Sequence, residues 1–293
     1  MSDSGRGRAG ATRPLRWEDG SASASLHATL SGQSTSTLTE SPSPHADAPQ
    51  NGAPDAPSSV RRTLRFFRHF DASDPWIGSR SSLSPRDADR FPGDTLAATF
   101  ARALCKRSAI PVKELFEAVE TFSLCRKVIR RPSLADLCCG HGLGGVLFAL
   151  MEHQVERVLL VDRDRPPSAD SVLAAAADVA PWVAPKIEWR ETQLNRAQLE
   201  PGTAVLAIHA CGLRTDTAIE MAIESGGPFA ALPCCRPHNA HPAPMSLKNA
   251  LGADVAIDVH RTYALEAKGY RVSWKDIAET ITPKNRALIA KAP

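Results

Sequence analysis

Residues 136–144, Asp-Leu-Cys-Cys-Gly-His-Gly-Leu-Gly, combine one acid with three glycines directly after a short apolar stretch. Glycines at this spacing let the backbone turn sharply after a strand and approach a ligand closely, because a side chain there would occupy the ligand's volume. The next segment is apolar and helical in character, so its free N-terminal amides would face the ligand. The run predicts a nucleotide-cofactor loop, with the cofactor held by Asp136, Gly140, Gly142 and Gly144.

A second acid stands where such a fold needs one. The apolar run Val158 to Val161 ends in Asp162, 22 residues beyond Gly140. In adenosyl and dinucleotide folds, the acid at the end of the second strand holds the ribose hydroxyls. Because an acid leads the glycines, the pattern favours S-adenosyl-L-methionine over NAD. The alternative for Asp162 is a solvated acid at a strand end. Glu191, after the third predicted strand, would reach the adenine edge or is a solvated loop acid.

From Ser133 onward, apolar runs of strand length alternate with helical periodicity, which predicts an α/β fold with a parallel sheet covered on both faces. Strands are expected at Ser133 to Leu137, Arg157 to Asp162, Lys186 to Arg190, Ala204 to His209, Phe229 to Pro233, Tyr270 to Asp276 and Arg286 to Lys291. Helices are expected at Leu143 to Glu152, Ser168 to Val179, Thr215 to Ser225 and Asp258 to Lys268. Turn residues before the last strand predict a C-terminal β-hairpin. That hairpin is the mark of a seven-stranded, Rossmann-like methyltransferase sheet.

Ligands of such sheets bind outside the carboxyl ends of the strands, and two of these ends carry unusual chemistry. Predicted strand four runs into His209, Cys211 and Asp216, and predicted strand five runs into Cys234 and Cys235. His209 could orient or deprotonate an acceptor hydroxyl or amine, since an imidazole keeps a neutral fraction at working pH. We expect His209, Asp216, Cys234 and Cys235 to line the acceptor side. Alternatively, His209 and Asp216 only brace the loop, with Asp216 capping the next helix.

Three motifs together resemble one family: the glycine loop, His209-Ala-Cys-Gly with its downstream Thr215-Asp216, and Pro233-Cys234-Cys235. They look like the methyltransferase domain shared by eukaryotic tRNA 2′-O-methyltransferases of the acceptor stem, glutathione S-transferase C-terminal-domain-containing proteins and many bacterial proteins. The resemblance covers about Phe116 to the C-terminus. It implies a class I S-adenosyl-L-methionine-dependent methyltransferase with RNA, tRNA included, as the substrate class. The zinc-finger segments of the tRNA enzymes have no counterpart here, since no paired Cys and His spacing occurs before the domain.

The cysteines allow two further interpretations. Cys211 and Cys234 could serve pyrimidine C5 methylation, in which a thiolate adds to the ring. Cys234, Cys235, His238 and His241 could instead bind zinc, although the usual two-residue gap between the cysteines is missing. The simplest expectation is that Cys234 and Cys235 form a tight wall on the substrate side of the pocket, without a metal.

Residues 1–60 are rich in Ser, Ala, Pro, Thr and Gly and have few large apolar side chains. Such a composition cannot bury enough surface to offset chain entropy, so a disordered tail is expected. The seven cysteines are scattered, and no secretory signal precedes them. No apolar stretch approaches the about 20 residues of a membrane span. These features predict a soluble, cytoplasmic protein without a disulfide framework.

Residues 61–131 are expected to form a small helical extension, with helices over Asp94 to Arg107 and Val112 to Arg131, ahead of a methyltransferase domain at 132–293. The extension would pack on the sheet or cover its pocket. The basic and aromatic run Arg61 to Phe70, together with Arg126 to Arg131, supports RNA contact. Its basic side chains would neutralise phosphates while Phe66, Phe67 or Phe70 stack on bases. The alternative is a solvated amphipathic helix, since the net charge is only +3.

Other classes of protein stay open on the sequence alone. A non-catalytic scaffold would bind S-adenosyl-L-methionine without turnover and present the helical extension to a protein partner. A zinc-dependent binding module would lose its fold on chelation. A methyltransferase could also act on a protein or a small molecule instead of RNA.

Overall fold

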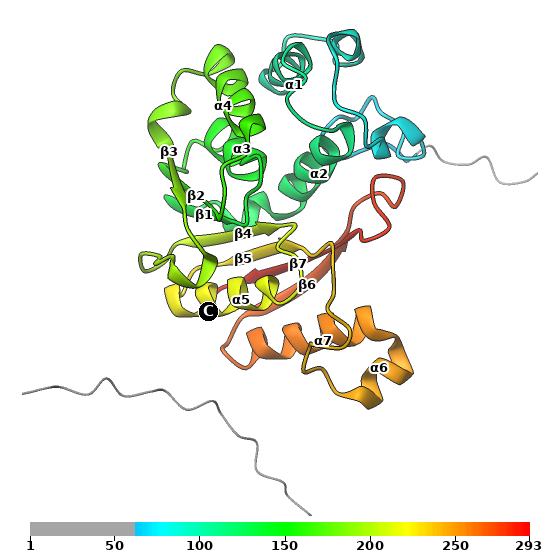
Figure 1. Ribbon diagram of the computed structural model, residues 1–293, viewed down its shortest axis with the longest axis vertical. Coiled ribbons are helices and arrows are strands. Elements are labelled where there is room, and N and C mark those ends of the chain that lie inside the picture. Colours follow the sequence, from blue (N-terminus) through cyan, green and yellow to red (C-terminus); the bar gives the residue numbers. More distant parts are fainter. Residues whose placement is uncertain (1–61) are drawn as a thin grey trace, which may run out of the picture. The chain divides into compact units, whose positions relative to one another are not determined.

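Seven strands form one sheet at the centre of residues 62–293, the part of the chain that this computed structural model describes (Figure 1). The strand order is β3-β2-β1-β4-β5-β7-β6. Strands β1 to β5 are parallel, and β7 is antiparallel to both β5 and β6. The strands are β1 (Ser133–Leu137), β2 (Arg157–Asp162), β3 (Ile187–Glu191), β4 (Ala204–Ile208), β5 (Phe229–Leu232), β6 (Arg271–Asp276) and β7 (Arg286–Lys291). The predicted tail, 1–60, lies outside the described residues, as does Arg61.

The predicted α/β fold, a Rossmann-like methyltransferase sheet that ends in a β-hairpin, is confirmed. Strands β1, β2 and β7 have the predicted bounds residue for residue, and the others differ by one residue. The chain reverses its direction of travel across the sheet between β1 and β4. In open α/β sheets, ligands bind in the crevice outside the carboxyl ends of the strands at such a switch point.

The helices in the described residues are α1 (Leu96–Lys106), α2 (Val112–Ile129), α3 (Leu143–Met151), α4 (Pro167–Val179), α5 (Arg214–Ser225), α6 (Met245–Leu251) and α7 (Ala253–Glu266). Helix α6 was not expected, and α7 begins before the predicted Asp258. Gly252, with φ 78°, separates the two helices. Because this glycine interrupts the helical periodicity, the sequence pattern did not predict α6. Within residues 62–293, no helix has the length and apolar character needed to cross a membrane.

The sheet has helices on both faces (Figure 1). Side chains alternate along each strand, so Leu134 and Leu206 face α2 and α3, while Ala135 and Val205 face α5. Helices α1 and α4 pack beside α2 and α3 on the first face, and α7 packs with α5 on the second. The two faces are therefore separate hydrophobic layers, with the functional edge of the sheet running between them.

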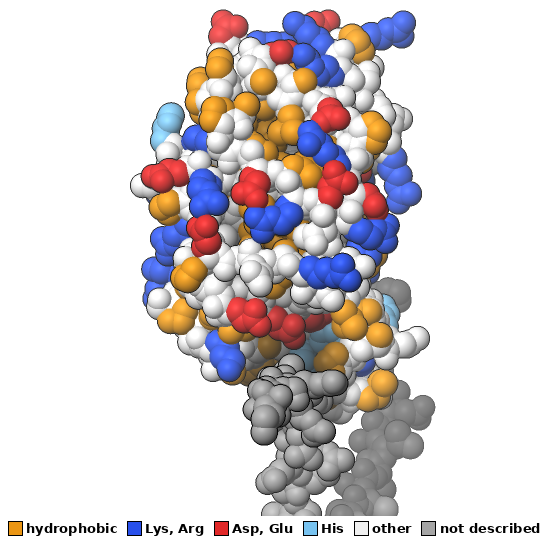
Figure 2. Space-filling model, turned by 60° about the vertical axis from the view of Figure 1, so that its left-hand side comes forward, with side chains coloured by type: hydrophobic (Ala, Val, Ile, Leu, Met, Phe, Trp, Pro, Cys, Tyr) orange, Lys and Arg blue, Asp and Glu red, His pale blue; other side chains and the backbone are white. Residues whose placement is uncertain are grey.

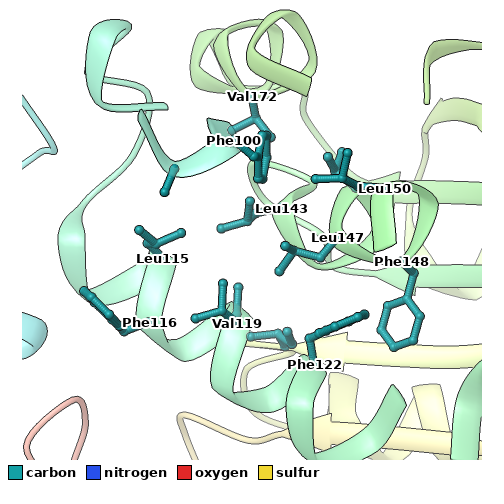
Figure 3. Close-up of a cluster of buried hydrophobic side chains, with 14 of the residues drawn as sticks. Phe100, Leu115, Phe116, Val119, Phe122, Leu143, Leu147, Phe148, Leu150 and Val172 are labelled. Atoms are coloured by element: carbon teal, nitrogen blue, oxygen red, sulfur yellow. The ribbon is translucent and has the colours of Figure 1, made fainter. Parts of the chain in front are cut away.

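Helix α2 is fixed to the sheet by large apolar side chains. Figure 3 shows Val119 and Phe122 of α2 pointing toward Leu147 and Phe148 of α3. The rings of Phe122 and Phe148 lie edge to face, with centroids 4.9 Å apart. Aromatic pairs in this arrangement stabilise a core beyond their buried area. Because this face of α2 is packed, the opposite face, which carries the acids described below, has a fixed position.

The basic and aromatic run differs from its prediction. Residues 62–70 form turns, not a helix. Phe67 and Phe70 are only 5% and 6% exposed, and both pack on the buried ring of Phe116. These two rings are not available to stack on bases, whereas Phe66 is partly exposed. The prediction was wrong for the two rings because they lie among exposed arginines in the sequence, although the rings themselves are buried in the core.

The alternative of a solvated amphipathic helix is wrong for residues 62–70, but Arg126 and Lys127 do lie on helix α2. RNA contact through these segments stays a prediction. Of the second basic segment, Arg126 and Arg130 both pair with the buried Glu152.

Candidate active site

The chain leaves β1 through a loop with unusual backbone conformations. Cys138, Gly140 and Gly142 have φ values of 57°, 54° and 73°. A Cβ on Gly142 would lie 2.8 Å from Cδ1 of Leu160, a side-chain end that could shift, so the left-handed conformation is what favours glycine there. Cys138 adopts the left-handed conformation without that freedom, and such local strain is typical of functional sites. Helix α3 begins directly after the loop, so its first amides face the same space.

Asp136 lies beneath this loop and is only 1% exposed. Its Oδ2 accepts a hydrogen bond from the Gly145 N–H at 2.7 Å, while its Oδ1 has no partner among the described residues. Burial raises the pKa of this carboxyl from 3.8 to about 7, against the opposing effect of the Gly145 N–H. Asp136 therefore ties the start of α3 to β1. It lines neither cavity described below, so its contact with the cofactor stays a prediction.

A cavity of about 410 Å³, the Asp162 cavity, opens beyond the ends of β1, β2 and β3. Asp162 lies on its wall and accepts hydrogen bonds from the N–H groups of Gly140, at 2.8 Å, and Arg163, at 2.7 Å. A carboxylate oxygen has lone pairs for more than one donor, so a ribose hydroxyl can still bind there. The wall consists of Cys138, Val161, Asp162, Arg163, Thr192, Gln193, Leu194, Asn195, Arg214 and Thr217. Glu191 is exposed and is not part of it, whereas the next two residues are.

A second cavity of about 640 Å³, the His209 cavity, shares Cys138 with the first. It lies between the glycine loop, the end of β4 and the first turns of α2. Its wall consists of Arg80, Pro111, Lys113, Glu114, Glu117, Cys138, Cys139, Gly140, His141, Ile208, His209 and Cys234. Of the four residues predicted for the acceptor side, His209 and Cys234 lie on this wall, and Asp216 and Cys235 do not.

His209 follows β4 with φ 67°, a second strained residue at the sheet edge. Its Nε2 lies 3.0 Å from Oε2 of Glu117, whose side chain is 1% exposed and also pairs with Lys113. Burial alone would raise the pKa of Glu117, but the hydrogen bond and charge of His209, with Lys113, outweigh burial and lower it. Glu117 is therefore ionised and pairs with Nε2 of His209, whose Nδ1 has no hydrogen-bond partner among residues 62–293.

A second histidine–glutamate pair lies beside the first. Nε2 of His141 is 2.7 Å from Oε2 of Glu114, and Nδ1 of His141 bonds to the hydroxyl of Ser168. Burial would raise the pKa of Glu114, but the hydrogen bond and charge of His141 outweigh it and lower the pKa. Both ring nitrogens of His141 are thus occupied. This pair fastens the glycine loop between α2 and α4.

Glu114, Glu117 and His141 were not predicted as site residues from the sequence. Acids on a helix ordinarily form its solvated face, so exposed side chains are the ordinary expectation for Glu114 and Glu117. Their three-residue spacing places them on the same side of α2. The signal that could have revealed them is that Leu115, Phe116, Ala118 and Val119, all around these acids, are apolar, which predicts burial for Glu117.

Asp216 lies on α5, where it accepts hydrogen bonds from Arg261 at 3.0 and 2.8 Å and from Nε2 of His241 at 3.0 Å. Burial would raise the pKa of Asp216, but the bonds and charge of Arg261 and the charge of His241 lower it. It does not cap α5, whose N-cap has no side-chain hydrogen bond. Asp216 joins α5 to α7 and to the segment after β5, so any effect on the acceptor acts through position and stays a prediction.

Three thiols meet at the ends of β4 and β5. Sγ of Cys211 lies 2.7 Å from Sγ of Cys234, which lies 3.7 Å from Sγ of Cys235. The zinc set considered from the sequence is not brought together, because His238 pairs with Asp254 and His241 pairs with Asp216. The C5 mechanism stays a prediction, although Cys234 does line the His209 cavity.

Residues 110–240 match a family model described as a methyltransferase domain. This range begins just before α2 and ends after the thiol cluster, so it contains most of both cavity walls. The structure also has weak likenesses to solved proteins, among them the following three. One is the methyltransferase domain of bacterial CtHen1, with 16% identity, coverage of 61% of this chain and 97% of that one, and a TM-score of 0.37. Another is a SAM-dependent methyltransferase from Aquifex aeolicus, with 12% identity, coverage of 59% and 90%, and a TM-score of 0.34.

The third is the Pyrococcus abyssi tRNA (uracil-54, C5)-methyltransferase in complex with S-adenosyl-L-homocysteine. It has 13% identity, coverage of 60% of this chain and 38% of that one, and a TM-score of 0.36. Likenesses this weak say nothing about the acceptor. Comparison with curated proteins gave no match.

The described residues fit S-adenosyl-L-methionine. Asp162 offers a carboxylate at the end of β2, Gly140 has open space where a side chain would stand, and two cavities adjoin at the glycine loop. Together with the matched domain, these features define a class I methyltransferase. The chain is an enzyme of this class, and S-adenosyl-L-methionine is its cofactor.

Proposed function

We propose that this enzyme methylates RNA on a ribose hydroxyl and that His209 removes the proton of that hydroxyl. The observation that carries the proposal is the His209–Glu117 pair, with a 3.0 Å separation, on the wall of a cavity that adjoins the Asp162 cavity. A hydroxyl is a poor nucleophile until its proton is removed, and a fixed imidazole is suited to remove it. RNA as the substrate class is supported by the resemblance of the three motifs to tRNA 2′-O-methyltransferases.

The cofactor supplies a methyl group on a positively charged sulfur, which is a good leaving group. Asp162 would bind the cofactor's ribose, and the backbone from Gly140 to α3 would orient the rest of the cofactor. Nδ1 of His209 would accept the hydroxyl proton, and the ionised Glu117 would stabilise the imidazolium that forms. Positioning and proton removal are then most of the protein's contribution.

The predicted site residues have different roles in this mechanism. Asp162 and the glycines hold the cofactor. His209 acts on the acceptor, and Cys234 forms part of the acceptor wall. Asp216 and Cys235 would influence the acceptor only through the loops they belong to. The extension at 61–131 belongs to the acceptor side, since α2 contributes Glu114 and Glu117 to the His209 cavity.

RNA contact would depend on side chains at the rim of the His209 cavity. Arg80 lies on its wall and is exposed. On the face shown in Figure 2, Lys and Arg side chains lie among Asp and Glu side chains. Mixed charge of this kind gives little non-specific phosphate attraction, so affinity would come from a few placed contacts. A cytoplasmic location is part of this proposal, because all seven cysteines are free thiols, as expected in a reducing compartment.

The test is to incubate the full chain with methyl-labelled S-adenosyl-L-methionine and extract from cells that lack the protein. We expect label that ribonuclease releases and protease does not. After alkaline hydrolysis, we expect the label in dinucleotides, because a 2′-O-methyl group blocks cleavage of the adjoining phosphodiester bond. Asp162→Ala, which should lose cofactor affinity, is the matched negative control.

Label in single nucleotides after alkaline hydrolysis would place the methyl group on a base and contradict the ribose acceptor. Label released by protease, or found in small molecules, would contradict RNA. Cofactor binding without any labelled product would favour the scaffold interpretation.

A further inference from the structure

We propose that Cys211, Cys234 and Cys235 bind a soft divalent metal ion, with Zn²⁺ as the expected occupant, at the wall of the His209 cavity. This site is independent of the nature of the methyl acceptor. The three Sγ atoms all lie within 4.8 Å of one another, and no other such group of ligand atoms occurs among residues 62–293.

The gathering of thiols follows from the topology of the sheet. Strands β4 and β5 are parallel neighbours, with Ile208 paired to Leu232, so both segments leave the sheet at one edge. Cys211 lies three residues past β4, and Cys234 and Cys235 begin two residues past β5. Five of the seven cysteines lie at this edge, because Cys138 and Cys139 follow β1, whereas the other two lie in α1 and α2. Three converging thiols provide the soft sulfur ligands that Zn²⁺ prefers over hard oxygens.

The separations are close to those that a bound ion requires. Zn–S bonds of about 2.3 Å in tetrahedral geometry place two sulfurs about 3.8 Å apart. The Cys234–Cys235 separation is 3.7 Å, and the Cys211–Cys234 separation of 2.7 Å must open when an ion enters. Cys211 lies in a turn, where a χ1 rotation can supply that movement without shifting a strand.

Hydrogen bonds from neighbouring residues, and not from the thiols themselves, hold both thiol-bearing segments in place. The Thr215 hydroxyl donates to the carbonyl of Ala210 at 2.6 Å, next to Cys211. After β5, the Arg236 guanidinium donates to the carbonyl of Pro233 at 3.2 Å and to the buried carboxylate of Asp258 at 2.7 to 3.1 Å. Such outer bonds fix ligands in place before a metal arrives. The segments around the thiols are therefore preorganised.

Binding would proceed by exchange of protons for metal. Each thiol loses one proton, three Zn–S bonds form, and three protons pass to solvent, so the site carries one net negative charge. Three protein ligands leave one tetrahedral position, which water can fill, as in open zinc sites. Because Cys234 lines the His209 cavity, the ion would join the loops after β4 and β5 beside the acceptor wall.

The experiment measures metal content directly. The full chain is reduced under anaerobic conditions, incubated with Zn²⁺, dialysed against a weak chelator and analysed for bound zinc by mass spectrometry. We expect one zinc per chain, loss of zinc in Cys211→Ser and Cys234→Ser, and full zinc in His238→Ala. The last variant is the matched control, because His238 belongs to the alternative ligand set and is exposed. Cofactor binding by calorimetry confirms that each variant is folded.

A second readout uses Co²⁺ in place of Zn²⁺. We expect an intense thiolate-to-cobalt charge-transfer band that weakens in both serine variants and persists in His238→Ala. The proposal is overturned if the reduced wild-type chain takes up no zinc, if Cys211→Ser keeps it, or if His238→Ala loses it. It is also overturned if a Cys211–Cys234 disulfide forms in air despite excess Zn²⁺.

Discussion

Two histidine–glutamate pairs lie side by side in the His209 cavity, and they differ in how many ring nitrogens of the histidine have a partner. Both glutamates come from α2, three residues apart, and both have lowered pKa values because a histidine faces them. In the first pair, Glu114 and Ser168 occupy both nitrogens of His141. In the second, Glu117 occupies only Nε2 of His209. An imidazole with a partner on both nitrogens can hold a loop in place, whereas an imidazole with a free nitrogen can also accept a proton.

The supporting elements explain the difference. His141 lies in the glycine loop between α2 and α4, so a helix is available on each side of its ring. His209 lies past the end of β4, and the cavity takes the place of the second helix. Identical side-chain chemistry thus serves structure at one position and is available for reaction at the next. This comparison gives an order of expected effects.

The largest effect is expected from the two histidines. His209→Ala should lower kcat at least about 100-fold, since a general base contributes about 10²–10⁴-fold. Its affinity for S-adenosyl-L-methionine should be unchanged, because His209 does not line the Asp162 cavity. His141→Ala should keep most of kcat and weaken cofactor affinity through a looser glycine loop. Single-turnover kinetics and calorimetry measure the two quantities. Equal losses of kcat in both variants would break the distinction between the pairs.

Substitution of the glutamates should change kcat in the same order as substitution of their histidines, but by smaller factors. Glu117→Gln should lower kcat about tenfold, because a neutral partner no longer stabilises the imidazolium formed in the reaction. Glu114→Gln should keep kcat within about twofold, since its histidine takes no proton in this scheme. Steady-state kinetics at saturating cofactor make the measurement, and each variant is the control for the other. A larger loss in Glu114→Gln than in Glu117→Gln would assign the base to His141.

The glycine loop and the position of Asp162 could be predicted from the sequence, and the side chains around His209 could not. Asp162 and the glycines follow local rules: a strand, a sharp turn, a helix start and an acid at the next strand end. Glu117 and Glu114 reach the cavity only because α2 packs across the sheet through Phe122 and its neighbours. Such a contact between distant segments leaves no periodic signal. Cys211 lies beside Cys234 for the same reason, since strand order decides which loops meet. Asp216 does not line the His209 cavity, because it faces Arg261 of α7.

Asp136 extends the comparison, because it is a buried acid with one oxygen that has no hydrogen-bond partner among residues 62–293. Its pKa is raised to about 7 by burial, so between about pH 4 and 7 the folded chain keeps a proton that the unfolded chain has lost. The free energy of unfolding should therefore fall as pH rises through this window, by up to about 1.4 kcal/mol per pH unit from this group. The glutamates have lowered pKa values, so their contribution is lost only at more acid pH, below their ordinary value of 4.5.

Asp136→Asn should flatten that dependence, because the amide does not titrate and its oxygen can still accept the Gly145 N–H. Urea unfolding at about pH 5, 6 and 7 measures the slope for both chains without cofactor. Parallel slopes in the wild-type chain and the variant would show that Asp136 is ionised throughout this range.

The smallest effect is expected from Ser168, whose hydroxyl is a ring partner that His141 has and His209 lacks. Ser168→Ala removes the bond to Nδ1 of His141. His141 then has a glutamate as its one ring partner, as His209 does. The loss of one partly exposed hydrogen bond should cost about 1 kcal/mol of stability. Yet His141 should not become a base for the reaction, because the proposed mechanism places the acceptor at the end of β4. The double variant Ser168→Ala, His209→Ala decides this point. Its kcat should stay as low as that of His209→Ala alone, whereas recovery of activity would show that a free imidazole nitrogen, and not its place after β4, is what the reaction requires.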